Sequence, residues 1–259
     1  MISQGEEAAG RTVLRISGPD REPFLQGLVT NDVRRLRSGA VYAALLSAQG
    51  KYLADFLLVP DGDTILLDTA APLADGLARR LALYRLRADV RIEPTALHVH
   101  RGLGAAPAGA IADPRHPALG WRAYGTEAGS APAIDWDALR VAHLIPESGI
   151  ELIPDDSYIL EQGFERLNGV DFRKGCYVGQ EVTARMKHKT ELRKGLVAVA
   201  IDGDAAPGTP ILTADGREAG RLHTRSGGQA LAYLRLDRAE GPLTAGAARV
   251  RAITGAADA

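Results

Sequence analysis

The chain has very little cysteine: Cys176 is the only one among 259 residues. A single thiol excludes an internal disulfide, and it cannot supply the roughly four protein ligands that a structural zinc ion or an iron–sulfur cluster usually needs. Long apolar runs are also missing, since Ala43–Leu46 and Phe56–Val59 are among the longest and a membrane span needs about 18 apolar residues. We therefore expect a soluble protein with no membrane partner and no stable metal site of its own.

The N-terminal residues lack the features of a targeting segment. Glu6 and Glu7 stand where a signal or transit peptide would carry basic residues followed by an apolar stretch. On this ground we expect residues 1–10 to form a flexible tail and the protein to be cytoplasmic.

Overall charge is balanced, with 31 Lys and Arg against 32 Asp and Glu, but it is unevenly distributed. The balance gives no reason to expect direct nucleic-acid binding. Glu147–Glu165 carries six acidic residues and no basic one, whereas Arg173–Lys194 carries seven basic residues, including Lys189, against Glu181 and Glu191. Two interpretations remain open: a solvated basic face beside the acidic stretch, or an anion site around the only thiol.

The pattern of apolar residues and turns predicts a mixed α+β region followed by a β-barrel. We expect a strand over 11–17, an antiparallel meander over 41–68, and helices over 73–86 and 135–144. From Gly195 onward, short strands alternate with Gly, Pro and Asp turns, which is typical of a small antiparallel barrel. The predicted domains are the tail 1–10, an α+β region over 11–194 with two interleaved subdomains, and a barrel over 195–259.

Familiar catalytic motifs are missing. The run 102–104 lacks the third glycine of a dinucleotide fingerprint, and Gly50-Lys51 lacks the flanking residues of a phosphate loop. His98 and His100 would share one face of a strand, but no carboxylate or cysteine is near them in the sequence, so packing or solvent exposure explains them better than a metal. These absences argue against a conventional metal, phosphate-loop or triad enzyme.

The chemistry concentrates around Cys176. Arg173 and Lys174 precede it, and a helix is predicted from about Tyr177 to Met186. Adjacent cations and a helix N-terminus both favour a thiolate, so we expect a lowered pKa for Cys176 and a reactive thiol. The alternative, a lone cysteine that fills the core as a small hydrophobe, stays open.

The run Lys174–Glu181 resembles the signature of the YgfZ family, the folate-binding relatives of the glycine-cleavage T-protein, which include a mitochondrial iron–sulfur assembly branch. Its motif residues are Lys174, Gly175, Cys176, Tyr177, Gly179, Gln180 and Glu181. Other segments match in the expected order: 24–27 with 30–32, 49–51 with Asp55, 113–115 with 119–122, and Arg140 with 145–149. The resemblance covers about residues 11–194, and the barrel-like remainder fits it.

The resemblance implies a T-protein-like fold, with folate-binding α+β subdomains around a central pocket and a C-terminal antiparallel β-barrel. A carboxylate can accept the adjacent N–H groups of a pterin, and cations suit the glutamate tail. We therefore predict that Asp55 and Glu147 bind the pterin of tetrahydrofolate or a one-carbon derivative, and that Arg122, Arg140 and Arg185 bind its tail.

The implied function is folate-dependent help in the assembly or repair of iron–sulfur clusters in client enzymes, including the radical enzymes that thiolate tRNA. Since one cysteine cannot anchor a cluster, Cys176 would act transiently, as one ligand, a sulfur acceptor or a partner in a mixed disulfide. The alternative enzyme is a folate-dependent aminomethyl or methyl transferase that uses Asp55. Ala54, where T-proteins commonly carry a second Asp, argues against glycine-cleavage activity, as does the shorter chain. A third interpretation is a binding scaffold with a structural cysteine.

Overall fold

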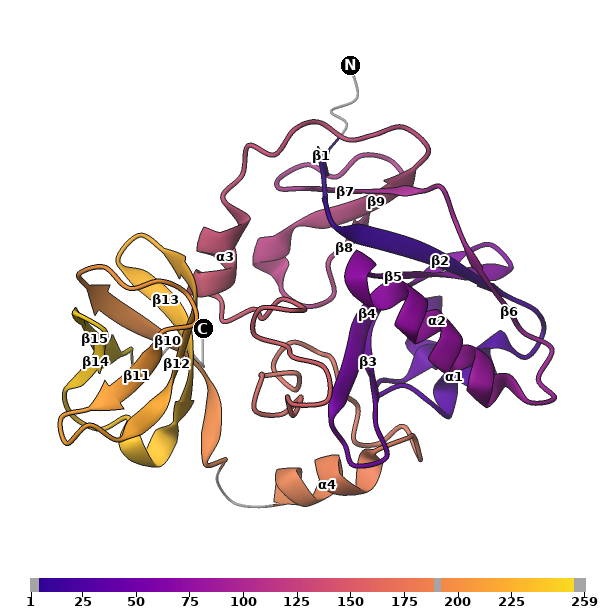
Figure 1. Cartoon of the computed structure of the whole chain (residues 1–259). Coiled ribbons are helices and arrows are strands. Elements are labelled where there is room, and N and C mark those ends of the chain that lie inside the picture. The colour runs from indigo at the N-terminus through magenta and orange to yellow at the C-terminus, as the bar shows by residue number, and fades with distance from the viewer. Residues whose placement is uncertain (1–4, 189–191, 254–259) are drawn as a thin grey trace. The chain divides into compact units, whose positions relative to one another are not determined.

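The chain folds into two compact units, in a computed structural model that describes residues 5–188 and 192–253 (Figure 1). Unit 1 comprises Met1–Ile134 and Glu165–Val182, and unit 2 comprises Asp135–Phe164 and Thr183–Ala259. The expected order, an α+β region followed by an antiparallel barrel, is confirmed. No helix within the described ranges is long and apolar enough to cross a membrane.

A five-stranded antiparallel sheet forms the main core of unit 1. Its strand order is β3 (Val41–Leu46), β4 (Tyr52–Asp61), β5 (Thr64–Ala70), β2 (Arg11–Ser17) and β6 (Arg91–Pro94). The meander expected over 41–68 is confirmed as β3, β4 and β5. Near-continuous apolar runs on β3 and β4 are buried, because helices and loops cover the sheet. The same core contains Leu14, Ile16, Phe56, Leu58 and Leu67.

Short helices and one longer helix pack against this sheet. They are α1 (Arg21–Gln26), the 3-10 helix η1 (Val33–Arg37) and α2 (Ala71–Arg85). Leu77 and Leu81 of α2 belong to the core of the sheet, and Pro72 stands in the first turn, where its missing N–H costs no helical hydrogen bond.

Leu86 ends α2 in a conformation that suits glycine. Its φ is +44° and its side chain is 90% exposed, so no burial offsets the strain. A non-glycine residue in a sparsely populated backbone region costs on the order of 1–3 kcal/mol. We expect Leu86→Gly to raise the free energy of unfolding by about 1 kcal/mol in chemical denaturation. Leu86→Ala keeps the Cβ and is the control; equal stability of the two variants would contradict the prediction.

The second sheet of unit 1 shows that the N-terminal prediction is wrong in its described part. Its order is β1 (Glu6–Glu7), β7 (His98–Gly102), β9 (Trp121–Gly125) and β8 (Ile111–Ala112), with the 3-10 helix η2 (Pro117–Leu119) before β9. Glu6 does not lie in a flexible tail, because it is only 7% exposed. Its carboxylate accepts the backbone N–H groups of Ala133 and Ile134, both at 2.8 Å. These donors offset the cost of burying the charge and tie β1 to the segment before Asp135, while β1 pairs with β7 through the backbone.

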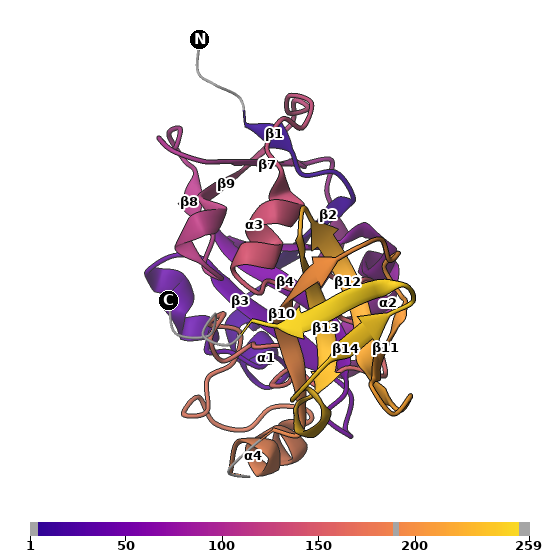
Figure 2. The same cartoon turned by 90° about the vertical axis from the view of Figure 1, so that its left-hand side faces the viewer.

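Unit 2 contains a closed six-stranded antiparallel barrel, drawn in orange to yellow in Figures 1 and 2. The strand order is β10 (Lys194–Asp202), β13 (Gln229–Arg235), β12 (Glu218–Ser226), β11 (Pro210–Thr213), β14 (Leu243–Ala245) and β15 (Ala248–Ala252), and the 3-10 helix η3 (Leu236–Arg238) follows β13. Alanines fill much of the narrow interior: Ala219, Ala230, Ala232, Ala245 and Ala248 are fully buried.

Residues before the barrel pack on its outside. Helix α3 (Trp136–Ala142) begins as predicted at Asp135, whose carboxylate accepts the backbone N–H of Ala138 at 2.8 Å. Val141 and Leu144 then pack against Ala198 and Leu231 of the barrel strands. The compact unit is therefore larger than the barrel predicted over 195–259, and α4 (Gln180–His188) spans the passage from unit 1 to unit 2.

Candidate functional site

Cys176 lies exposed in a loop of unit 1 that precedes α4. This exposure contradicts the alternative of a cysteine buried in the core. The helix begins at Gln180 instead of Tyr177, because Gly179 has a φ of +83° and the Gln180 side chain accepts the backbone N–H of Tyr177 at 3.1 Å. Cys176 therefore lies outside the first helical turn, and the predicted effect of a helix N-terminus on its thiol loses its basis.

Lys174 anchors the thiol loop. Its ammonium donates to the backbone carbonyls of Gln26 at 2.6 Å and Val29 at 2.8 Å, and it stands 4.9 Å from the centre of the Tyr177 ring. Lys174 is 7% exposed, and burial lowers its pKa to about 8. The Gln26 amide donates in return to the Lys174 carbonyl at 3.2 Å. Lys174, predicted from the sequence to favour a thiolate as an adjacent cation, therefore also has a positioning role.

The segment before Lys174 is bound to the same part of the chain. The Thr30 hydroxyl donates to the Gly169 carbonyl at 2.6 Å, and the Asn31 amide donates to the Asn168 carbonyl at 2.6 Å. The backbone N–H of Asp171 donates to the Thr30 carbonyl at 3.0 Å. The segment 24–32 and the residues that lead into the motif Lys174–Glu181, which are far apart in the sequence, therefore contact each other.

Close packing explains the glycine that precedes α4. A Cβ on Gly179 would lie 2.5 Å from the Ser47 carbonyl oxygen and 2.9 Å from the Cβ of Leu46. A Cβ on Gly50 would lie 2.7 Å from the Cβ of Val182. The turn between β3 and β4 thus lies directly against the start of α4, and only glycine fits at these two contacts.

Asp55 lies on β4 in the core of unit 1 and is 4% exposed. Its carboxylate accepts the hydroxyl of Tyr52 at 2.7 Å and that of Tyr42 at 3.0 Å. Burial and the neighbouring Asp55 charge raise the pKa of Tyr42 well above its ordinary value, so this hydroxyl remains a donor. The Arg115 guanidinium lies 5.7 Å from the centre of the Tyr42 ring. Both tyrosines are visible in the sequence only as apolar strand residues, so neither was predicted to belong to a site.

Arg122 belongs to a buried network of charges. Its guanidinium donates to Asp113 at 2.9 Å and to Asp68 at 3.0 Å. Arg115 also binds Asp113, and Arg11 binds Asp68 at 2.7 Å. Burial alone would raise the pKa values of Asp68 and Asp113, but the adjacent guanidiniums outweigh it and hold both pKa values below the ordinary range. Arg122 already donates to two carboxylates of the protein. It is therefore poorly placed to bind the carboxylate of a ligand.

Arg140 has a corresponding arrangement in unit 2. It donates to Glu151 at 2.5 Å, to Asp137 at 2.7 Å and to the Thr224 hydroxyl at 3.1 Å, while Glu147 lies 3.9 Å away. The structure thus brings together Arg140 and Glu147, both predicted to bind folate. Glu147 retains 33% side-chain exposure, in contrast to 7% for Arg140. Arg185 is exposed on α4.

Within the described ranges, no three His, Cys, Asp or Glu side chains lie close enough together to hold a metal ion. His98 contacts the Glu7 carboxylate at 3.0 Å, and His100 contacts the Glu127 carbonyl at 2.8 Å. Lys189 and Glu191, which contribute to the charge pattern of the sequence, lie outside the described residues.

Comparison with known proteins finds relatives of the barrel region and of most of the chain. The profile of the CAF17 C-terminal β-barrel domain matches residues 193–256. The human mitochondrial iron–sulfur cluster assembly factor IBA57 is 34% identical, over 90% of this chain and 78% of its own length. The Neurospora crassa IBA57 homolog is 31% identical, over 80% of this chain and 55% of its own.

A solved structure supports the predicted fold. The glycine cleavage system aminomethyltransferase T from Bartonella henselae has a TM-score of 0.73 and 11% identity, over 97% of this chain and 86% of its own. The T-protein-like fold with a C-terminal barrel is therefore confirmed.

The expected cytoplasmic location is contradicted by the same relatives, whose names describe mitochondrial proteins. That expectation depended on Glu6 and Glu7, which form β1 and carry no information on location.

Proposed function

Because the chain belongs to the family of the iron–sulfur cluster assembly factor IBA57, we propose that it assists iron–sulfur cluster assembly through its only thiol. The observation that carries the proposal is the exposure of Cys176 in a loop whose position is fixed by the buried Lys174. An exposed thiol can meet a partner protein, and a fixed loop lowers the entropy lost when it does so.

One thiol limits what the chain can do with a cluster. Iron–sulfur clusters are usually held by about four cysteine thiolates. Cys176 therefore supplies at most one ligand, and the cluster is a cargo whose other ligands come from an assembly protein or a client enzyme. The motif Lys174–Glu181 resembles the signature of the YgfZ family, and on that resemblance we extend the proposal to clients that include tRNA-thiolating radical enzymes.

We also propose that tetrahydrofolate binds, with Asp55 as the pterin carboxylate. The fold is that of a bacterial aminomethyltransferase T, and the Tyr42 and Tyr52 hydroxyls fix the buried Asp55 carboxylate in place. Glu147 and Arg185, the second carboxylate and the remaining tail cation of the sequence prediction, both belong to unit 2, so the proposal for this site is limited to Asp55. Arg122 and Arg140 fit a tail-binding role poorly and instead hold neighbouring acids in position. When bound, a reduced folate would supply or accept a one-carbon unit.

Two substitutions with two measurements separate thiol chemistry from folate binding. We expect Cys176→Ser to reduce iron–sulfur enzyme activity at least about tenfold in cells that depend on this chain, because a hydroxyl is a poor cluster ligand and cannot form a disulfide. The variant should still bind tetrahydrofolate in a titration of the purified protein. Asp55→Asn should weaken that binding at least about tenfold, because an amide cannot accept two pterin donors.

The matched control is His188→Gln, an exposed substitution on α4, which should leave both measurements unchanged. Full cellular activity of Cys176→Ser would refute the thiol proposal. Absence of saturable tetrahydrofolate binding by the wild-type protein would refute the folate proposal alone. If Asp55→Asn abolishes activity and Cys176→Ser does not, the alternative aminomethyl or methyl transferase is the better description. Thermal unfolding of each variant separates these outcomes from misfolding.

A further inference from the structure

The C-terminal end of helix α2 exposes a group of apolar side chains. Leu83 is 78% exposed, Leu86 directly after the helix is 90% exposed, and Tyr84 between them is 38% exposed. A single exposed leucine is ordinary on a protein surface, but here three large apolar side chains stand within four positions. We call Leu83, Tyr84 and Leu86 the α2 patch.

The α2 patch lies away from the face of the helix that packs on the protein. Helix α2 places Leu77 and Leu81 in the core of the five-stranded sheet (Figure 1). Arg79, Arg80 and Leu83 are exposed. Because residues three or four apart share a helix face, Leu83 stands beside both arginines. The exposed face of α2 therefore combines apolar side chains with positive charge.

The backbone at Leu86 indicates that the folded chain gains no stability from this leucine. Its φ is +44°, a conformation that suits glycine, and its exposed side chain has almost no packing to offset the strain. Strained residues of this kind occur most often at functional sites. A contact outside the folded chain therefore explains Leu86 better than stability does.

Arginines surround the α2 patch. Over residues 75–91, five arginines stand against two aspartates. Arg79, Arg80 and Arg87 are exposed, and none of them makes an ion pair with a residue that the structure describes. The dipole of α2 does not explain Arg79 and Arg80, because its effect is confined to the last turn. Cations beside exposed apolar side chains suit an occupant that is anionic at its surface and apolar beneath.

An anionic lipid bilayer fits this description better than a second protein does. A stable protein interface buries about 800 Å² and about 20–30 residues on each partner, whereas the apolar part of this surface is three side chains. Leucines that project from a helix end can enter the acyl region of a bilayer without a complementary pocket, while neighbouring arginines bind the lipid phosphates. Tyrosine is enriched at the level of the headgroups.

We propose that the C-terminal end of α2 attaches unit 1 to the surface of an anionic membrane. Leu83 and Leu86 enter the acyl region, and the exposed arginines before and after them bind lipid phosphates. Such a contact needs no membrane-spanning segment, so the expectation of no membrane partner, which depended on the missing span, does not extend to it. The proposal goes beyond the function proposed above, since it involves neither Cys176 nor folate, and its test can fail without affecting either.

Vesicles of equal parts phosphatidylcholine and phosphatidylglycerol are the probe, and vesicles of phosphatidylcholine alone are the neutral comparison. In sedimentation with the full-length protein, we expect the affinity for the anionic vesicles to be at least about tenfold higher, because each cation near an anionic surface raises the affinity about fivefold. Binding should weaken as the salt concentration rises, since ions screen the arginines.

Leu86→Gly separates binding from folding. It removes both the side chain and the backbone strain, so the variant should be at least as stable as the wild-type protein while its vesicle affinity falls about tenfold. Leu83→Gln should lower the affinity similarly, and Arg79→Gln should lower it about fivefold. The matched controls are Leu103→Gln, at an exposed leucine outside α2, and Arg251→Gln, at an exposed barrel arginine. Neither control should change the affinity.

Several outcomes would overturn the proposal. They are equal binding to the two kinds of vesicle, no binding to either, wild-type affinity in both Leu83→Gln and Leu86→Gly, or an equal loss in the controls. Self-association of the wild-type protein that Leu83→Gln abolishes, without any vesicle binding, would also overturn it, because the α2 patch would then belong to a contact with a second copy of the chain.

Discussion

Asp68→Asn is expected to lower the free energy of unfolding of unit 1 by about 3–5 kcal/mol, because it removes the negative partner from a buried pair of arginines. Asp68 is fully buried on β5 and accepts from Arg11 at 2.7 Å, from Arg122 at 3.0 Å and from the Tyr124 hydroxyl at 3.0 Å. Arg122 and Tyr124 lie on β9, so this one carboxylate joins the two sheets of unit 1. Urea denaturation measures the loss.

Asp61→Asn is the matched control within the same sheet. Asp61 contacts Arg15 at 3.5 Å, and both side chains are more than two-fifths exposed. Exposed ion pairs of this kind contribute about 0–1 kcal/mol, because water and salt screen them. If the two variants lose the same stability, the buried network does not have the role assigned to it.

The same network predicts a dependence on pH. The pKa values of Asp68 and Asp113 are lower in the folded protein than in the unfolded chain. The unfolded chain therefore binds protons more readily as the pH falls, and the stability that both carboxylates provide is present above their unfolded pKa of about 4 and is lost progressively below it. Of the two carboxylates, Asp68→Asn retains only Asp113. Between about pH 6 and about pH 3, its free energy of unfolding should therefore fall by less than that of the wild-type protein.

Glu151→Gln is expected to destabilise unit 2 by a similar amount, about 3–5 kcal/mol. The Glu151 side chain is fully buried and accepts a hydrogen bond from Arg140 at 2.5 Å. It also accepts the hydroxyl of Thr224 at 2.6 Å and the backbone N–H of Thr224 at 3.1 Å. It also accepts the backbone N–H of Glu147 at 2.9 Å. In the variant, an amide NH2 replaces one carboxylate oxygen and cannot accept the hydrogen bonds that this oxygen receives. Arg140 would also lose its buried counter-charge.

Asp137→Asn tests whether burial is the reason. Asp137 binds the same Arg140 at 2.7 Å, but its side chain is 59% exposed, so we expect a loss below about 1 kcal/mol. The two tryptophans allow each unit to be followed separately, since Trp121 lies in unit 1 and Trp136 in unit 2. In a Trp121→Phe background, the fluorescence of Trp136 should follow the unfolding of unit 2 and report the stability lost in Glu151→Gln. An unchanged transition there would contradict the prediction.

Local sequence patterns predicted the regular elements well. The meander over 41–68, the Asp135 cap and the barrel follow from turn residues and alternation, which act over a few positions. The start of α4 was displaced because Gly179 and the Gln180 side chain delay it, a tertiary effect of the β3–β4 turn lying against Gly179. Strand β14 has only three residues, too few for alternation to indicate it.

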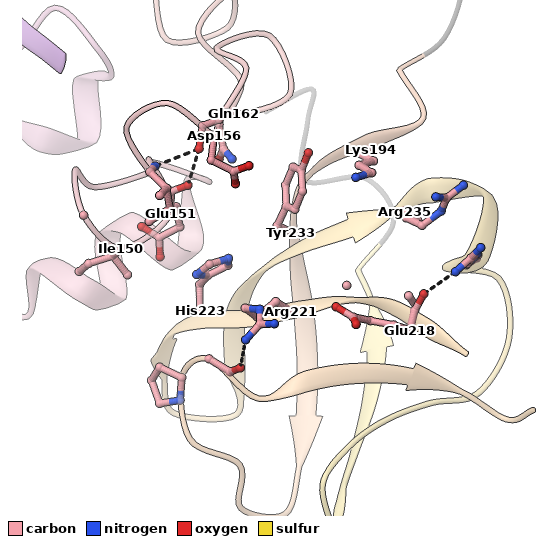
Figure 3. A pocket seen from close by; sticks show the side chains of 18 residues that line it. Ile150, Glu151, Asp156, Gln162, Lys194, Glu218, Arg221, His223, Tyr233 and Arg235 are labelled. Atoms are coloured by element: carbon pink, nitrogen blue, oxygen red, sulfur yellow. Dashed lines mark hydrogen bonds between the residues drawn. The ribbon is translucent and has the colours of Figure 1, made fainter. Parts of the chain in front are cut away.

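The site was harder to predict, because charge in a sequence does not reveal its partner. Arg122 looks like any ligand-binding arginine until Asp68, 54 positions away, is placed beside it. Arg140 and Lys174 are similar cases, since each is buried with acceptors of the protein itself. A pocket in unit 2 (Figure 3), lined by Gln162, Lys194 and Arg235 among others, was not predicted, because these residues come from separate elements and share no motif. Cys176 was found because the chain has no other thiol.

The reciprocal hydrogen bonds between Gln26 and Lys174 join residues 148 positions apart. The thiol of Cys176, about two-thirds of the way along the chain, therefore inherits its placement from a short helix near the N-terminal end that is synthesised much earlier. In a newly made chain, the loop that carries the sulfur is not fixed in place until that long-range closure is complete. Substitutions at Gln26 should accordingly be classified with those at Cys176, although they leave the sulfur itself unaltered.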